Sequence, residues 1–215
     1  MAELEIEIDL SAFTETAGEL ARVARGFYER GWVLGTSGNF SAVVNRDPLR
    51  LAITSSGVDK GLIAPENVLL IDDAAKVIEG GGRPSAETLL HLAIARLRGA
   101  GAVLHTHSVW SNILSNAFAS DGGFKIEGYE MLKGLEGVST HEHSEWVPVI
   151  ENSQHMTGLA ASVSEALSKH PGSHGFLLLR HGLYTWGRDL EEAKRHVEIF
   201  EFLVEVTGRT HLASR

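Results

Sequence analysis

Short apolar runs alternate along this chain with longer segments whose apolar residues recur every three or four positions. The short runs predict β-strands at 39–44, 49–54, 67–72, 102–107, 146–151 and 175–187. The longer segments predict amphipathic helices at 13–30, 86–99, 108–118, 156–169 and 193–208, with a short helix at 128–135. Several strands are separated only by short turns, which antiparallel pairs allow and parallel pairs do not. The pattern therefore predicts an α/β fold of three layers, with antiparallel pairs in the sheet and helices on its faces.

Two helix starts carry capping signals. Ser85 precedes the helix at 86–99 and is expected to be its N-cap. Asp189 and Glu192 form a D-x-x-E pattern ahead of the last helix, which is typical of a capping box.

The composition narrows the class of protein. The 215 residues are 43% hydrophobic, which suits one globular domain spanning 1–215. The formal net charge of -9, with no run of Lys or Arg, argues against nucleic acid or an anionic membrane as partner. The acidic start "MAELEIEIDL" and the lack of a long apolar stretch predict a cytoplasmic protein. Because the chain has no cysteine, a bound metal would need His, Asp or Glu ligands.

The stretch "GAVLHTHSVW" places two histidines at the end of an apolar run. In a strand, His105 and His107 point to the same side with Cα atoms about 6.6 Å apart, so both imidazoles can approach one ion. A catalytic zinc site typically has three protein ligands and one open position. His181, which follows another apolar run, is the best third ligand. The alternative is a chance pair of hydrogen-bonded histidines, but the strand-end position and the additional His favour a metal site.

A second His-x-His pair, His141 and His143, lies in the polar stretch "THEHSE" and is interpreted as a solvated loop. Five further histidines are expected to be surface or capping residues: His155, His170, His174, His196 and His211.

Two Gly- and Ser-rich loops, "GTSGNFS" and "TSSGVDKG", could bind a phosphate through backbone N–H groups and hydroxyls. Lys60 would add positive charge there. Loops of this composition are also ordinary turns. Beside a metal site, however, they indicate a pocket for a phosphorylated small molecule. The expected anion-binding residues are Ser37, Gly38, Asn39, Ser55, Ser56, Gly57 and Lys60.

Two glutamates are candidates for the acid/base group. Glu87 and His91 are four positions apart on a predicted helix and so share a face, and Glu130 lies within the short helix at 128–135. A metal-bound ketone makes the neighbouring C–H more acidic, but a base must still remove the proton, and burial could raise a glutamate's pKa for that task. Both residues could equally lie on solvated helix faces, and position alone does not choose between them.

The segments "GTSGNFS", "TSSGVDK", "SAETLLH", "LHTHS" and "RHGLYTWG" occur in this order and together resemble the class II aldolase and adducin family of zinc-dependent sugar-phosphate enzymes. The resemblance covers nearly the whole chain. It implies an α/β/α sandwich around a mixed, mostly antiparallel sheet, and a homotetramer with active sites near subunit interfaces. It also implies one Zn²⁺ per subunit on His105, His107 and His181, and a phosphorylated ketose as substrate.

The segments "EGYEMLKGL" and "VPVIEN" resemble a dehydratase branch of this family, which implies that Glu130 is the acid/base residue. Glu87 matches the glutamate that family aldolases use near the metal. The alternatives are therefore a sugar-phosphate aldolase or epimerase and, from another class, a noncatalytic adducin-like module. The C-terminal "TGRTHLASR" lacks the tyrosine that family aldolases often supply, which disfavours the aldolase.

Overall fold

The computed structural model describes residues 10–213. Within this range nine strands form one sheet in the order β4-β3-β2-β1-β5-β9-β8-β7-β6. Neighbouring strands are antiparallel except β7 and β8, which are parallel. The strands are β1 (Asn39–Arg46), β2 (Leu49–Thr54), β3 (Val68–Ile71), β4 (Val77–Glu79), β5 (Ala102–Thr106), β6 (Gly123–Glu127), β7 (Ser144–Ile150), β8 (Gly175–Leu178) and β9 (Gly182–Gly187).

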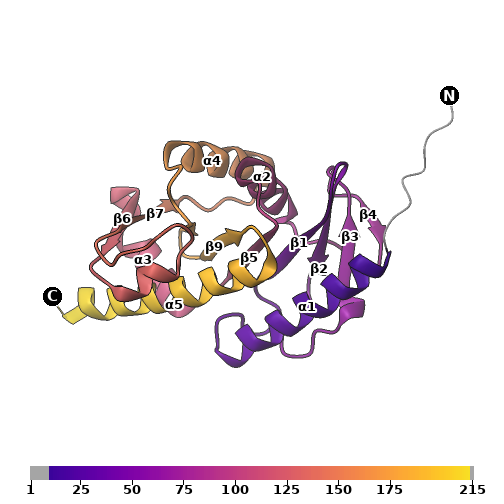
Figure 1. The fold of residues 1–215 in the computed structure, drawn as a ribbon, viewed down its shortest axis with the longest axis horizontal. Coiled ribbons are helices and arrows are strands. Elements are labelled where there is room, and N and C mark those ends of the chain that lie inside the picture. The colour runs from indigo at the N-terminus through magenta and orange to yellow at the C-terminus, as the bar shows by residue number, and fades with distance from the viewer. Residues whose placement is uncertain (1–9, 214–215) are drawn as a thin grey trace.

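Helices cover both faces of this sheet (Figure 1). The α-helices are α1 (Leu10–Glu29), α2 (Thr88–Arg98), α3 (Val109–Ala117), α4 (Met156–Lys169) and α5 (Leu190–Ala213). Short 3-10 helices are η1 (Pro65–Asn67), η2 (Ala119–Asp121) and η3 (Glu130–Gly134). In Figure 1, α2 and α4 lie above the sheet, whereas α1 and α5 lie below it. The expected three-layer sandwich with a mostly antiparallel sheet is confirmed.

The central strand β5 shows how the layers are packed. Ala102 and Leu104 belong to the buried cluster under α1 and α5, whereas Val103 belongs to the cluster under α2 and α4. This alternation follows from the period of two along a strand. His105 therefore points to the same side as Val103, toward α2, and it stacks on Tyr184 of β9 with ring centroids 3.9 Å apart.

The single strand expected at 175–187 is instead a hairpin of two strands, so the prediction missed the turn between them. β8 ends at Leu178 and β9 begins at Gly182, with a tight turn in which the His181 N–H donates to the Leu178 carbonyl at 3.1 Å. Arg180 in this turn has φ of 51°, a left-handed conformation uncommon for a residue with a side chain. Because the flanking residues are apolar and the turn residues are not typical ones, the pattern hides the break.

The expected N-cap at Ser85 is also wrong. The α2 helix begins at Thr88, and Glu87 occupies the cap position without a side-chain capping bond. Ser85 forms a preceding turn, in which its carbonyl accepts from the Thr88 N–H at 3.1 Å. This turn directs the Glu87 side chain toward Asn39, whose Nδ2 donates to Glu87 Oε2 at 2.7 Å.

The strands β4 and β6 were not predicted, because each is short and carries polar or partly exposed residues. The acidic residues 1–9, on which the expectation of a cytoplasmic protein partly rests, lie outside the described residues. Over residues 10–213, no helix has both the length and the apolar character needed to cross a membrane.

Candidate metal centre

The three predicted histidine ligands meet at one end of β5. His105 is the fourth residue of β5, His107 directly follows the strand, and His181 lies in the turn between β8 and β9. His107 Nε2 lies 2.8 Å from His105 Nε2, which lies 3.3 Å from His181 Nε2. Ligand atoms of a tetrahedral zinc with bonds of 2.0–2.1 Å lie about 3.3 Å apart. The three nitrogens are therefore spaced to bind one ion.

Hydrogen bonding and burial keep these imidazoles in the form that binds metal. His105 Nδ1 lies 2.9 Å from the Leu183 carbonyl, so the ring N–H donates there and leaves the Nε2 lone pair free. Burial, reinforced by the neighbouring His107 and His181, holds the pKa of His105 well below its ordinary value. Burial, followed by the charges of His181 and Lys60, lowers the pKa of His107 to about 4. Both rings are neutral at neutral pH.

Glu87 adds an oxygen donor to this set. Its Oε1 lies 3.3 Å from His181 Nε2, and its Oε2 lies 3.6 Å from His105 Nε2. Within the described part of the chain, Oε1 is buried without a hydrogen-bond partner, and so is His181 Nδ1. A buried carboxylate oxygen without a partner is costly, particularly beside neutral imidazoles. Three imidazole nitrogens and this oxygen are a donor set that fits a divalent cation such as zinc.

A buried hydrogen-bond chain orients Glu87 from behind. His91 of α2 contacts Asn39 Oδ1 through Nε2, and its Nδ1 lies 2.8 Å from Ser41 Oγ. Asn39 in turn donates to Glu87 at 2.7 Å. Burial lowers the pKa of His91 to about 3, so the ring is neutral. The expected proximity of Glu87 and His91 is thus realised through Asn39, a contact that the helical spacing alone does not reveal.

The two predicted phosphate loops meet beside the histidines. A cavity of about 140 Å³ is lined by both loops, together with Ser85, Glu87 and His107. Its lining includes all six uncharged residues that were expected to bind the anion, namely Ser37, Gly38, Asn39, Ser55, Ser56 and Gly57. Serine and threonine residues and Asn39 thus line a space next to His107 and Glu87. Such a surface is suited to an anionic group.

Lys60, which was expected to add positive charge near the phosphate, lies between the two loops rather than in the lining of this cavity. Its side chain is buried, and Nζ donates to the carbonyls of Thr36 at 3.3 Å and Val58 at 3.0 Å. Burial lowers the pKa of Lys60 to about 8. The ammonium therefore ties the two loops together from behind the cavity.

Comparison with known protein families agrees with the family resemblance of the sequence motifs. The family described as class II aldolase and adducin N-terminal domain matches residues 18–207. The chain belongs to this family.

Relatives and solved structures within the class II aldolase and adducin family are similar over most of the chain. The methylthioribulose-1-phosphate dehydratase of Marinobacter nauticus is 41% identical, covering 92% of this chain and 94% of its own length. That of Methylococcus capsulatus is 43% identical, covering 94% and 98%. The structure of an L-fuculose 1-phosphate aldolase superimposes with a TM-score of 0.77 at 22% identity, covering 94% of this chain and 88% of its own. At that identity it supports the fold alone.

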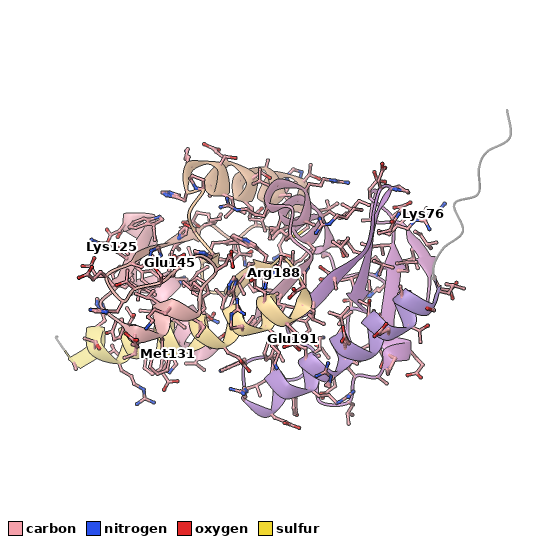
Figure 2. All side chains as sticks on the ribbon, in the orientation of Figure 1. Lys76, Lys125, Met131, Glu145, Arg188 and Glu191 are labelled. Atoms are coloured by element: carbon pink, nitrogen blue, oxygen red, sulfur yellow. The ribbon has the colours of Figure 1, made fainter. Side chains whose placement is uncertain are left out.

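Glu130, the other expected acid/base residue of this class II aldolase and adducin family member, lies apart from the cluster in the single subunit. Its side chain at the start of η3 is 71% exposed and pairs with Lys133 at 2.5 Å and with His141 at 3.8 Å. The hydrogen bond and charge of Lys133 lower the pKa of Glu130, which is opposite to the rise that burial was expected to produce. Its neighbour Met131 lies at the molecular surface beside α5 (Figure 2).

Three other histidines, His143, His174 and His196, are more buried than expected. His141 is exposed as expected, but His143 lies 2.9 Å from the buried carboxylate of Glu145. His174 contacts the same carboxylate, and His196 is buried with Nδ1 2.7 Å from the Trp186 carbonyl. His155 caps α4 as expected, because its ring accepts from the Gly158 N–H at 3.2 Å. Pairing between β7 and β8 brings Glu145 and His174 together, which no sequence spacing signals.

Proposed function

We propose that this protein is a zinc-dependent hydro-lyase of methionine salvage, which converts 5-methylthioribulose 1-phosphate into 2,3-diketo-5-methylthiopentyl 1-phosphate and water. The observation that carries the proposal is the three-histidine cluster beside the loop cavity, in a chain more than 40% identical to methylthioribulose-1-phosphate dehydratases over nearly its full length.

The space around His107 fits the two ends of such a substrate. The small polar cavity would take the phosphate. On another side, His107 borders an open groove of about 550 Å³, which is lined by Val109, Asn112, Ile113, Asn116 and Arg180. Val109 and Ile113 offer an apolar surface for the methylthio group, and Asn112 and Arg180 offer hydrogen bonds to hydroxyls. His107 lines both spaces, so the ketone would be held beside this ligand, between the phosphate and the methylthio group.

The chemistry divides between the metal centre and the protein's own groups. A divalent cation on His105, His107 and His181 would supply Lewis acidity, which makes the C3–H bond next to the ketone more acidic. Glu130 would take the C3 proton, the C4–O bond would break, and the departing hydroxyl would leave as water after accepting a proton. The donor of that proton would be the protonated Glu130 or a bound water, and the remaining enol would tautomerise to the diketone. Glu87, held by Asn39, would orient the ligand set.

Glu87 also supports a second candidate, a class II aldolase reaction. Unlike Glu130, it lies within the cluster, 3.3 Å from His181 Nε2, so it could accept the proton of the C4 hydroxyl and return it to C3 after cleavage. The reaction would then cleave the C3–C4 bond instead of removing water. The metal centre and the phosphate cavity would serve both reactions equally.

The proposal includes a homotetramer with active sites near subunit interfaces, and two features support it. Glu130 does not reach the cluster of its own subunit. Val109 and Leu34, which flank the site, are exposed apolar residues with 67% and 63% of their surface accessible. An interface at this edge would bury both and could bring the Glu130 of one copy to the metal centre of another. Cytoplasmic location remains a prediction.

The product decides between the two reactions. Zinc-loaded protein would be mixed with 5-methylthioribulose 1-phosphate and followed by phosphorus and proton NMR. We expect an intact five-carbon diketo phosphate. Formation of dihydroxyacetone phosphate and methylthioacetaldehyde would establish the aldolase, and failure to retain any divalent metal would exclude both enzymes in favour of a noncatalytic module.

A further inference from the structure

A second group of metal-binding side chains lies away from the first, where β7 and β8 run side by side. His143 precedes β7, Glu145 lies within it, and His174 directly precedes β8. His143 Nε2 lies 2.9 Å from Glu145 Oε2, and His174 Nδ1 lies 3.0 Å from the same oxygen. Figure 2 shows Glu145 further inside the molecule than Lys125 at the outer edge of β6. One ligand atom from each of the three residues lies within 4.8 Å of the others.

Burial makes the charge of this group significant. The Glu145 side chain is fully buried, whereas those of His143 and His174 are 29% and 17% exposed. Over residues 10–213, the ion-pair partners of Glu145 are these two histidines, and no Lys or Arg lies within 4.0 Å of its carboxylate. A buried carboxylate requires a positive partner to offset its lost hydration. The two imidazoles provide that charge only if they carry protons or hold a cation.

The surrounding hydrogen bonds orient the group as ligands. Glu145 Oε1 accepts the backbone N–H of His174 at 2.8 Å, which leaves Oε2 directed at the two rings. His174 Nε2 lies 2.9 Å from the Glu136 carbonyl, so that nitrogen carries the ring proton and donates it. With a cation bound, Nδ1 would then be free to coordinate it beside Glu145 Oε2. Metal-binding histidines are commonly oriented in this way by a carbonyl on the second nitrogen.

We propose that His143, Glu145 and His174 form a second divalent-cation site, distinct from the centre on His105, His107 and His181. Two imidazole nitrogens and one carboxylate oxygen suit zinc or a similar transition metal, with water completing the coordination on the exposed side of the histidines. The cation would join β7 to the start of β8. The cation would also fix the position of Glu136, through the hydrogen bond from His174 to the Glu136 carbonyl. Glu136 closely follows η3, the short helix that carries Glu130.

The test measures metal content in a protein whose first centre has been removed. The parent variant is His107→Ala/His181→Ala, which lacks two of the three imidazoles of that centre. After incubation with zinc chloride at micromolar free zinc and desalting, we expect about one zinc per chain in the parent. Adding His143→Ala should reduce this to near zero. Adding His141→Ala, which removes an exposed histidine from the same "HEH" stretch, is the matched control and should leave it unchanged.

A parallel comparison covers the case in which the parent variant does not fold. The intact protein should hold about two zinc ions per chain, and the single variant His143→Ala about one. The proposal is overturned if the folded parent binds no zinc, or if His143→Ala lowers the content of neither protein. The group would then be a proton-sharing Glu–His pair only. Because the readout is metal content in a protein without the first centre, the result does not depend on the proposed dehydratase activity.

Discussion

At Gly38, the loop beside the metal centre leaves no space for a side chain. The residue has φ of +74°, and a Cβ would lie 2.6 Å from Val33 Cγ1 and 2.8 Å from the His105 carbonyl. Gly38→Ala should therefore lower the free energy of unfolding by about 2–4 kcal/mol, from the left-handed backbone and the overpacking together. Gly57→Ala is the control, because Gly57 has φ of +77° but nothing within 4 Å of its Cβ. It should cost only about 1 kcal/mol.

Urea unfolding of the metal-free proteins would measure both costs, since bound metal would add its own contribution to stability. Equal losses for the two variants would show that the contacts of Gly38 with Val33 and β5 do not constrain the loop.

Single residues were predictable where the signal is local. The period of two along β5 is enough to place His105 and His107 on one side, and both are found together with His181. By contrast, the buried Glu145 and its partner His174 are 29 positions apart and meet only through strand pairing. The role of Asn39 likewise depends on pairing, because β1 sets it opposite His105. Such contacts are properties of the assembled sheet rather than of any local pattern.

Between elements, α5 is joined to β5 by a buried carboxyl group. Thr106 donates to Glu201 Oε1 at 2.5 Å, and burial raises the pKa of Glu201 to about 7. The folded state therefore holds this proton more tightly than the unfolded state, whose pKa is about 4.5. As a result, the free energy of unfolding should fall as the pH rises from about 4.5 through 7, by up to about 3 kcal/mol.

Glu201→Gln should remove this contribution, so the stability of the variant relative to the unaltered protein should increase between pH 5 and pH 8.5. Urea unfolding at several pH values would measure the difference, with Glu191→Gln on the exposed first turn of α5 as control. A constant difference across the range would mean that Glu201 does not titrate abnormally.

Whole elements were predictable when their apolar pattern was long and their ends were marked. The α5 helix begins after Asp189, whose Oδ1 accepts the Glu192 N–H at 2.8 Å as the D-x-x-E pattern predicts. The break between β8 and β9 was missed because apolar residues continue through it and the positive φ falls on Arg180. The start of α2 was missed because Ser85 uses its hydroxyl in a turn rather than in a cap. Competing local hydrogen bonds decide these boundaries.

For the whole molecule, the separation of Glu130 from the histidine cluster predicts that active sites are shared between subunits. Glu130→Gln should be inactive because it lacks the base, and His107→Ala/His181→Ala should be inactive because it lacks the metal centre. Unfolding and refolding the two variants together, or expressing them together, should restore activity. If each site combines the metal centre of one copy with the Glu130 of another, random mixing should recover about a quarter of the original activity.

The mixing experiment would contradict shared sites if no activity returned. A site contained within one subunit would lack either the base or the metal in every copy. No mixture could then recover activity, and Glu130 would have to reach its own cluster by a rearrangement of η3. Size-exclusion chromatography of each variant is the control, since both must assemble as the unaltered protein does. The exposed Val109 and Leu34 beside the centre would be buried in that assembly, so Leu34→Glu, which leaves the proposed substrate groove intact, should produce monomers that keep their zinc but lose turnover. Retention of metal without activity would locate the missing group on the neighbouring copy.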